Sequence, residues 1–300
     1  MTFSKLSKLV LALGASAALA ACGNSDSSND STDTSSDSTT EAAAITGPIS
    51  VISREEGSGT RDAFVEATGV MADDVDNTTA AATIMNGTDQ VMTTVADDPN
   101  AIGYISLGSL NDTVTAVSID GVEATEENVA SGDYAISRPF NIIYQGELEG
   151  VVADFHDFIF SEEGQKIVLD QGFVQAKADA EAYAGDGSQS GSITVVGSTS
   201  VSPVMEKLAE AYEELNSGVQ INITSNGSSA GVKAATDGTA DLGMASRALA
   251  DDETEVTAEA IATDGVAVIV NPENGVSDLS LATVASIFTG ETTNWEDTAQ

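Results

Sequence analysis

Three times in this chain, a short apolar stretch leads into a loop of glycine, serine and threonine, and the loop leads into a stretch with helical character. The loops cover residues 53–62, 196–203 and 226–233. Strands that alternate with helices bury their apolar faces by packing as layers around a sheet. This repeated unit therefore predicts an α/β architecture with mixed or parallel strands.

The expected elements are short. Apolar runs predict strands at residues 48–52, 102–105, 114–118, 140–144, 193–196, 219–224 and 266–270. Helices are expected at residues 152–160, 203–215 and 282–288. Within 203–215 the apolar residues recur at helical spacing, and Ser202 followed by Pro203 suits the start of a helix. Residues 185–191 are rich in glycine and serine and are expected to form a loop.

Each Gly/Ser/Thr-rich loop offers hydrogen-bond donors at a helix start, which favours a small anion. In the first loop, Ser58 and Thr60 supply hydroxyls, and Arg54 supplies a planar guanidinium suited to an oxyanion. A weaker fourth loop, residues 86–88, precedes an expected helix at 89–95. One such helix start is ordinary capping, but several in one acidic chain favour a common ligand. The loops therefore predict a site for a small anion.

The charge of the chain makes its few arginines informative. Ten Lys and Arg residues stand against 48 Asp and Glu residues, for a formal net charge of −38. Such a surface repels nucleic acid and anionic lipid, so no nucleic-acid partner is expected. Arg54, Arg61 and Arg247 nevertheless lie in or beside the Gly/Ser/Thr-rich loops. The alternative is that they are plain surface arginines paired with nearby acids.

The first 45 residues are unlike the rest of the chain. Residues 1–21 begin with lysines and continue into an apolar run too short to span a membrane comfortably. They end in Leu-Ala-Ala-Cys-Gly, which resembles the lipobox of bacterial lipoproteins, so a signal peptide and a lipidated Cys22 are expected. Cys22 is the one cysteine of the sequence, which excludes an internal disulfide. Residues 22–45 are rich in Ser, Asp and Thr and predict a disordered tether. An uncleaved apolar tail is the alternative.

The chain resembles the phosphate-binding lipoproteins of Pst-type ABC transporters in its loop at 53–62 and in segments 197–199, 226–233, 241–247 and 288–295. The resemblance covers essentially all of 46–300. It implies a two-lobed, type II periplasmic-binding-protein fold, with mixed sheets flanked by helices and a ligand cleft between the lobes. One lobe is expected to comprise residues 46–138 and 264–300, and the other residues 139–263.

The order of these segments differs from the usual one. In most members of that family, the segments that correspond to 197–199 and 226–233 come first. The chain is therefore expected to be a circular permutant, which domains tolerate because their termini often lie close together. The alternative is one part of a tandem pair.

The resemblance also implies which residues hold inorganic phosphate. The ligands expected from the first lobe are Arg54, Ser58, Gly59 and Thr60, and those from the second are Thr199, Ser200, Ser228 and Ser246. Many relatives carry an aromatic residue at the position of Ser200, where the backbone N–H binds the ligand. Glu56 is expected to orient Arg54, with Arg61 and Arg247 in support. For Arg247, a ligand role and a pairing with an acid remain equally open.

Ser246 departs from the family pattern. The best-known members have an aspartate there, which accepts the proton of hydrogen phosphate. A buried carboxylate penalises sulfate, which has no proton to offer. A serine can accept that proton too, but it rejects sulfate more weakly. Binding of an oxyanion is therefore a firmer expectation than selectivity for phosphate.

The expected function is therefore that of an extracytoplasmic, lipid-anchored solute-binding protein. It would be a monomer without cofactor or metal, contacting the membrane through its lipid anchor alone, and would deliver phosphate to the permease subunits and ATPase of an importer. The alternatives are a protein for another tetrahedral oxyanion, a phosphate sensor or adhesin, and a phosphatase.

Enzymatic interpretations find little support. The one histidine, His156, lies among apolar residues in an expected helix, which suits a helix face better than a general base. Residues 227–233 lack the Gly-Lys-Ser/Thr of an ATPase phosphate loop. Adjacent acids at 55–56, 73–74 and 251–252 are expected by chance in so acidic a chain. Trp295 is interpreted as a packing residue.

Overall fold

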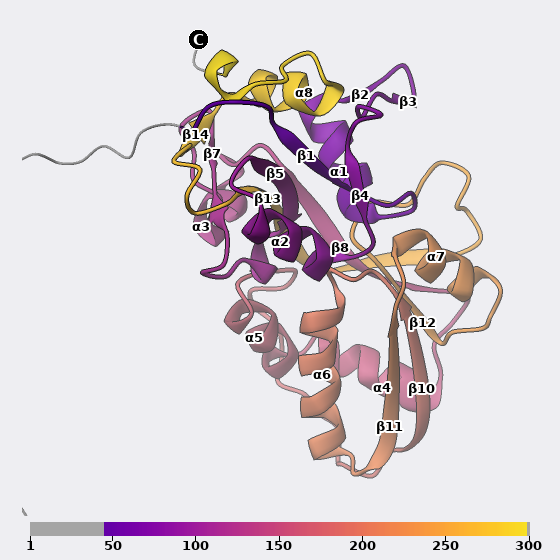
Figure 1. Ribbon diagram of the computed structural model, residues 1–300. Helices are drawn as coiled ribbons and strands as arrows, with labels where there is room; N and C mark the ends of the chain where they lie inside the picture. Colours follow the sequence, from indigo (N-terminus) through magenta and orange to yellow (C-terminus); the bar gives the residue numbers. More distant parts are fainter. Residues whose placement is uncertain (1–44, 299–300) are drawn as a thin grey trace, which may run out of the picture. The chain divides into compact units, whose positions relative to one another are not determined.

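A ten-stranded mixed sheet runs through the part of the chain that the computed structural model describes, residues 45–298 (Figure 1). Its main strands are β1 (Ser50–Arg54), β4 (Thr83–Met85), β5 (Ala101–Ser106), β8 (Ser137–Tyr144), β10 (Ser190–Gly197), β11 (Gly218–Ser225), β12 (Leu242–Ala245) and β13 (Thr257–Val270). Their order is β11-β10-β12-β8-β13-β5-β1-β4. Strands β10, β11 and β12 are parallel, as are β1, β4 and β5, whereas β8 and β13 are antiparallel to their neighbours. The expected α/β class with a mixed sheet is confirmed.

The remaining elements surround this sheet. The helices are α1 (Gly59–Thr68), α2 (Thr88–Asp97), α3 (Glu126–Ser131), α4 (Gly150–Ile159), α5 (Glu162–Asp170), α6 (Ser202–Leu215), α7 (Ser228–Thr236) and α8 (Leu281–Thr289), with 3₁₀ turns η1 (Leu107–Ser109) and η2 (Trp295–Asp297). Short strands β6 (Thr115–Ala116) and β9 (Val174–Gln175) pair with β13. Two separate ladders join β2 (Met71–Ala72) to β3 (Val75–Asp76) and β7 (Ser118–Ile119) to β14 (Asp278–Leu279). None of the described helices has the length and hydropathy that a membrane span requires.

At one end of the sheet, both faces are covered by helices. Along β12, Leu242 and Met244 belong to a core that includes apolar residues of α4 and α6. The next residue, Ala245, packs with Val232 of α7 on the opposite face. This alternation follows from the two-residue period of a strand. It fixes the starts of α6 and α7 beside the carboxyl ends of β10 and β11.

The other end of the sheet repeats this arrangement. In β13, Val266 and Val268 belong to a core with residues of α1 and α8, whereas Ala267 and Ile269 pack with Val91 and other residues of α2 and β5. Because β13 is buried on both faces, its second half reads as an uninterrupted apolar run. Helices α1 and α2 therefore pack on opposite faces of β13.

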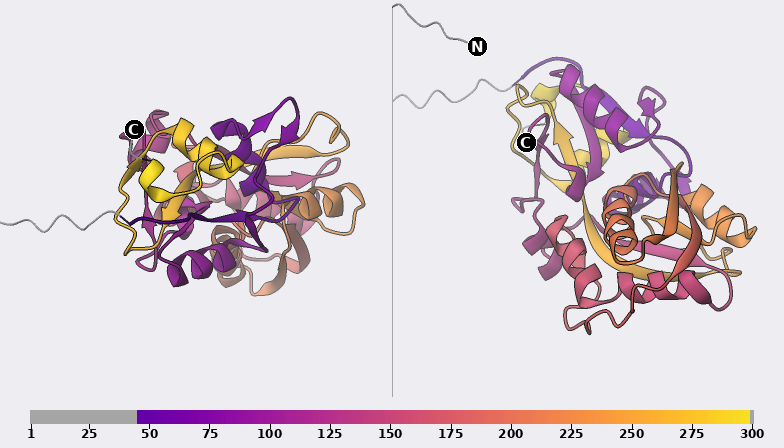
Figure 2. Two further views of the ribbon diagram at one scale, coloured as in Figure 1. Left: turned by 45° about the horizontal axis from the view of Figure 1, so that its top comes forward. Right: turned by 90° about the horizontal axis from the view of Figure 1, so that it is seen from below.

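Strand β13 contributes side chains to both cores, and the two further views show it running between the two groups of helices (Figure 2). Ile136, just before β8, and Val266 belong to the core with α1 and α8. Phe140 and Ile261 belong to the core with α4 and α6. The expected lobe boundaries, near residues 138–139 and 263–264, fall between the members of these two cores.

Most expected elements are present, with differences at their boundaries. The expected helices at 152–160, 203–215 and 282–288 correspond to α4, α6 and α8. Strand β13 begins at Thr257 rather than at 266. Its first half was not expected, because polar residues there interrupt the apolar pattern. Strand β10 begins at Ser190, inside the expected loop at 185–191. The expected strand at 114–118 is divided between β6 and β7.

Residues near the two ends of the described chain lie side by side. The Ile49 N–H donates to the Thr293 carbonyl at 2.8 Å, and the Trp295 N–H donates to the Gly47 carbonyl at 2.9 Å. Trp295 is 2% exposed and belongs to the core with α1 and α8, as expected of a packing residue. Residues 47–49 and 293–295 thus form one local structure.

Candidate functional site

The loop between β1 and α1 is built by a sharp turn and a helix cap. Gly57 has a φ of 81°, a left-handed conformation that glycine adopts without strain. Ser58 then caps α1, with its side chain accepting the Arg61 N–H at 3.4 Å. Gly59 and Thr60 form the first turn of the helix, and both are buried. Ser58 is therefore placed as a cap at the edge of the site.

Arg54, at the end of β1, is 1% exposed and uses its donors in two directions. Its Nε and Nη2 donate to Glu55 Oε2 and Oε1 at 2.7 and 2.8 Å. Nη2 also donates to Thr199 Oγ1 at 3.1 Å, and Nη1 donates to Thr60 Oγ1 at 3.4 Å. The guanidinium is therefore fixed by a carboxylate on one edge and faces hydroxyls on the other.

The expectation that Glu56 orients Arg54 is wrong, because Glu55 forms the pair. Glu55 follows β1 directly and lies half-buried beside the guanidinium, whereas Glu56 lies in the turn before Gly57 and faces solvent. Burial alone would raise the pKa of Glu55, but its hydrogen bonds and ion pair with Arg54 outweigh burial and leave the pKa below its usual value. Glu55 also accepts the Gly87 N–H at 3.2 Å, which ties the weaker fourth loop to this site.

Hydroxyls from the start of α6 meet those of α1 and α2. Ser200 Oγ lies 2.9 Å from Thr60 Oγ1 and 3.4 Å from Thr88 Oγ1. Thr199 Oγ1 lies 3.5 Å from Thr88 Oγ1. The backbone N–H of Ser200 donates to Ser198 Oγ at 3.2 Å, so the side chain of Ser200, rather than its amide, faces the other hydroxyls.

A second hydroxyl cluster joins the start of α7 to the end of β12. Ser198 Oγ donates to Ser246 Oγ at 2.9 Å, and Ser246 Oγ lies 3.3 Å from Ser228 Oγ. The Ser246 N–H donates to Ser228 Oγ at 3.0 Å. All three side chains are buried. Ser198 and Thr88 were not among the expected ligands, although both lie in the Gly/Ser/Thr-rich loops at 196–203 and 86–88.

Gly59 brings the two clusters together. A Cβ atom at this position would lie 2.4 Å from Ser228 Oγ and 2.8 Å from Ser246 Oγ. Nearby, the Ser229 N–H donates to the Gly57 carbonyl at 3.1 Å. The start of α1 therefore lies directly against the start of α7, at a distance that only glycine permits.

Arg61 and Arg247 support the loops rather than facing the hydroxyls. Arg61 Nη1 donates to the Arg54 carbonyl at 2.9 Å, and its Nε donates to Asp76 at 2.7 Å. Arg247 pairs with Glu253 at 2.7 Å and with Asp62 at 3.1 Å. Of the two roles left open for Arg247, the structure shows pairing with acids.

The expected ligands therefore converge. One connected region contains the expected ligands Arg54, Gly59, Thr60, Thr199, Ser200, Ser228 and Ser246, with Ser58 at its edge. Thr88 and Ser198 lie in the same region. The region offers a guanidinium, several hydroxyls and the amino-terminal turns of α1, α2, α6 and α7. Such donors stabilise negative charge. The arrangement is suited to enclosing a small oxyanion.

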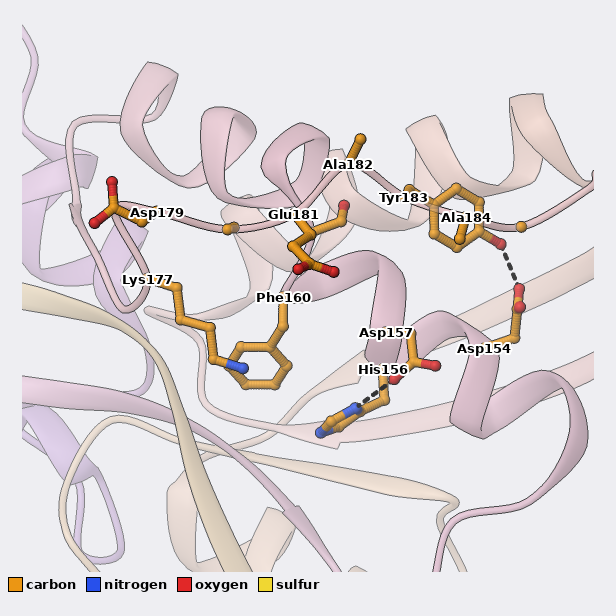
Figure 3. A pocket seen from close by; sticks show the side chains of 13 residues that line it. Asp154, His156, Asp157, Phe160, Lys177, Asp179, Glu181, Ala182, Tyr183 and Ala184 are labelled. Carbon is orange, nitrogen blue, oxygen red and sulfur yellow. Dashed lines mark hydrogen bonds and ion pairs between the residues drawn. The ribbon is translucent and has the colours of Figure 1, made fainter.

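A different cavity, of about 520 Å³, lies between α4 and the segment at 177–185 (Figure 3). Asp154, Asp157, Asp179 and Glu181 are among its lining residues. The Lys177 amine lies over the Phe160 ring, 4.5 Å from its centroid. An acidic lining of this kind disfavours an anion.

His156 borders this cavity and pairs with an acid. Its Nε2 lies 2.8 Å from Glu259 Oε2. Ser161, also in the lining, donates its hydroxyl to the Phe158 carbonyl at 2.7 Å as part of the cap of α5. The histidine is thus engaged by a carboxylate rather than by a serine. Within residues 45–298, no group of three or more His, Cys, Asp or Glu side chains is arranged to hold a metal ion.

Known proteins are similar to this chain over most of its length. The model of a PBP superfamily domain matches residues 15–163 and 182–300. The chain is 46% identical over 302 residues to the phosphate-binding protein PstS 2 of Streptococcus pneumoniae serotype 4, covering 99% of each chain. It is 47% identical over 270 residues to PstS 2 of Streptococcus agalactiae serotype V, covering 87% of this chain and 91% of the relative.

A solved structure is similar as well. The crystal structure of a phosphate-binding protein of a phosphate ABC transporter from Streptococcus pneumoniae TIGR4 superposes with a TM-score of 0.69 at 49% identity, covering 84% of this chain and 100% of that one. The extent of these matches decides the family. The chain belongs to the PBP superfamily and, within it, to the PstS phosphate-binding proteins.

Proposed function

We propose that this protein captures inorganic phosphate and delivers it to the permease and ATPase subunits of an ABC importer. The observation that carries the proposal is the contact between Arg54 Nη2 and Thr199 Oγ1 at 3.1 Å, which joins loops 145 residues apart in the sequence. Both groups can donate to one oxyanion. The PstS relatives, which are named as phosphate-binding proteins, support the choice of ligand.

The ligand would be enclosed between two lobes. The core with α1, α2 and α8 would be one lobe, formed by residues 46–138 and 264–300, and the core with α4, α6 and α7 would be the other, formed by residues 139–263. Arg54, Gly59, Thr60 and Thr88 would bind from the first lobe, and Thr199, Ser200, Ser228 and Ser246 from the second. Closure would exclude water and so strengthen each hydrogen bond to the anion.

Selectivity for phosphate would rest on hydroxyls. Ser246 accepts a hydrogen bond from Ser198 and lies within reach of Ser228, so its hydroxyl can adjust to a ligand that offers or lacks a proton. A serine leaves no buried charge unpaired when sulfate binds, so it penalises sulfate less than a carboxylate does. Sulfate is therefore the second candidate ligand.

Isothermal titration calorimetry with phosphate, sulfate and arsenate tests the assignment. The purified protein is expected to bind one phosphate saturably, and Arg54→Met is expected to weaken binding by more than tenfold, because hydrogen bonds to charged groups contribute about 1.5–3 kcal/mol each. Exposed Lys233→Met is the matched control. Sulfate binding as tight as that of phosphate would keep the site and remove the phosphate assignment, and hydrolysis of an aryl phosphate would favour a phosphatase.

We infer further that Cys22 carries a lipid anchor that holds the protein at the outer face of the cell membrane. Residues 1–44 lie outside the described residues, so this inference depends on the Leu-Ala-Ala-Cys-Gly sequence. Two acyl chains hold a protein firmly on a bilayer. Cys22→Ser is expected to release the protein from the membrane fraction of bacterial cells. Unchanged membrane association of that variant would contradict the anchor.

We also propose that the order of segments is circularly permuted relative to most family members. The hydrogen bonds between residues 47–49 and 293–295 support this proposal, since a permuted order requires these segments to be adjacent. The PstS 2 relative from S. pneumoniae aligns over 99% of both chains, so the two would share the order. A variant in which 300 is joined to 46 and new ends are opened before Ser190 is expected to fold and bind phosphate. Failure of that variant to bind would count against the permutation.

A transport role and a sensing role predict different genetic surroundings. Genes for two permeases and an ATPase beside the gene of this protein would support transport. Their absence would favour a phosphate sensor.

A further inference from the structure

A second buried arginine lies behind the candidate site. Arg138 of β8 is 3% exposed and pairs in register with Asp264 of β13. Its Nε and Nη2 donate to Asp264 Oδ2 at 3.0 and 2.9 Å. The side chain of Asp264 is 0% exposed, so the pair is removed from solvent on both sides. Isolated from water, two such charges interact strongly with each other and with any charge nearby.

The pair contacts the site through Ser246. Arg138 Nη1 donates to the Ser246 carbonyl at 3.4 Å. The hydroxyl of the same serine lies 2.9 Å from Ser198 Oγ and 3.3 Å from Ser228 Oγ. The main chain of a single residue therefore separates the Arg138 guanidinium from the hydroxyl cluster.

The two buried guanidinium groups also act on each other. Burial lowers the pKa of Arg138, Asp264 opposes this effect, and repulsion from Arg54 lowers the pKa further. The geometry places both groups against the connected hydroxyl loops, Arg54 through Thr199 and Arg138 through Ser246. An anion bound among these hydroxyls would therefore also be attracted by Arg138. Ser246 adds no negative charge to the site, whereas an aspartate there would cancel part of this attraction.

We propose that Arg138 is a positioning and charge-setting residue of the oxyanion site, held by Asp264 behind Ser246 so that its charge favours a divalent oxyanion. This inference rests on the proposed function, since it assumes that the anion binds at the Arg54 loop. Asp264 then sets how strongly Arg138 attracts the anion, because the negative charge of Asp264 offsets the positive charge of Arg138. The balance of this pair, rather than a carboxylate in the site, would determine the preferred charge of the ligand.

A purely structural role makes a different prediction. Arg138 and Asp264 join β8 to β13 where side chains pass from one core to the other, so the pair could simply hold the strands together. Loss of Arg138 and loss of Asp264 would then both disturb Ser246, and both would weaken anion binding. A charge-setting role predicts opposite directions, because one substitution removes a positive charge and the other a negative charge.

The test uses the full protein with Arg138→Gln, Asp264→Asn and the double variant. Titration calorimetry at about pH 8 measures the dissociation constants of phosphate and sulfate, and thermal unfolding records stability separately. Exposed Asp170→Asn is the matched control, since it makes the same change in net charge in the solvent-exposed Lys166–Asp170 pair of α5.

Arg138→Gln is expected to weaken the binding of both ligands by about tenfold, and Asp264→Asn to strengthen it by a similar factor, because each substitution removes one buried charge of opposite sign beside the site. The double variant should bind within about threefold of the parent, and Asp170→Asn should be unchanged. If Arg138→Gln does not fold, Asp264→Asn and the double variant decide.

Weaker or unchanged binding by Asp264→Asn would overturn the inference while leaving the proposed function intact. If the parent protein binds neither phosphate nor sulfate, the proposed function fails and this inference fails with it.

Discussion

Arg54 illustrates how one residue can serve both the fold and the site. Its Nε and one hydrogen of Nη2 are committed to Glu55, which fixes the plane of the guanidinium. Its remaining contacts reach Thr60 and Thr199, which come from different elements. An arginine held in this way loses little side-chain freedom when it binds an anion, so less of the binding free energy is lost to ordering it.

The first prediction concerns Gly59. Gly59→Ala is expected to weaken phosphate binding by about 10- to 100-fold, because the added Cβ would lie 2.4 Å from Ser228 Oγ, and overpacking costs about 1–3 kcal/mol. Calorimetry measures this effect. Thermal unfolding without ligand is the control, and the melting temperature of the variant should differ from that of the parent by only a few degrees. Phosphate affinity equal to that of the parent would show that α1 and α7 do not approach each other in the bound state.

The second prediction concerns the pH dependence contributed by Glu55. Because the folded-state pKa of Glu55 lies below its usual value of 4.5, its ionised form stabilises the fold above that pH. The contribution is lost as the pH falls below 4.5 through the lowered pKa. Glu55→Gln should therefore lower the melting temperature by a few degrees at neutral pH, and the difference from the parent should vanish in acid.

Glu56→Gln is the matched control for this experiment. Glu56 is exposed and precedes Gly57 in the turn, so its melting curve should follow that of the parent at every pH. A larger effect at position 56 than at 55 would contradict the pairing of Arg54 with Glu55.

The sequence predicted which loops would meet more reliably than which side chain would fill each role. Residues of the same type adjacent in sequence, such as Glu55 and Glu56, differ in the direction in which the turn points them, and nothing in their composition reveals that direction. Thr88 and Ser198 lie in recognised loops and were missed for the same reason. Arg138 precedes a proline inside a strand, where no loop motif marks it.

At the scale of the elements, the starts of four helices form the candidate site. Each start follows a strand whose carboxyl end reaches the same region, as β1 does for α1 and β10 for α6. Apolar periodicity predicted α6 because its buried face is regular. It did not predict the first half of β13, where polar and apolar residues are mixed, because pairing with β8 rather than composition holds that segment in the sheet.

The third prediction concerns the contact between α1 and the loop after β12. Arg247 pairs with Asp62 of α1 at 3.1 Å, and burial raises the pKa of Asp62 although Arg247 opposes this. Asp62→Asn removes only this pair and leaves the Arg247–Glu253 pair. In the proposed two-lobed protein, the variant should release phosphate up to about fivefold faster, as an interaction of about 1 kcal/mol implies.

Stopped-flow displacement of bound phosphate measures the release rate. Asp237→Asn is the matched control, since it makes the same change of charge in the exposed Lys233–Asp237 pair of α7. The difference between Asp62→Asn and the parent should shrink at high salt, because screening weakens partly exposed pairs. Equal release rates for the parent and Asp62→Asn at low salt would contradict a latch between the proposed lobes.

At the scale of the whole molecule, one sheet serves two cores. Strand β13 runs through both, and the candidate site lies where the loops from each side meet. The sequence predicted the α/β class from the alternation of strands and helices, since that pattern has few packing solutions. The convergence of the loops depends on contacts between residues more than a hundred positions apart, such as Thr60 and Ser200, which periodicity does not encode.

Loops from both cores are expected to hold one phosphate ion, and a crystal structure of the protein grown with phosphate is the sharpest test. A single phosphate is expected, with oxygens within hydrogen-bond distance of Arg54, Thr199 and Ser228 together. Phosphate bound elsewhere, or contacted by residues of only one core, would contradict it.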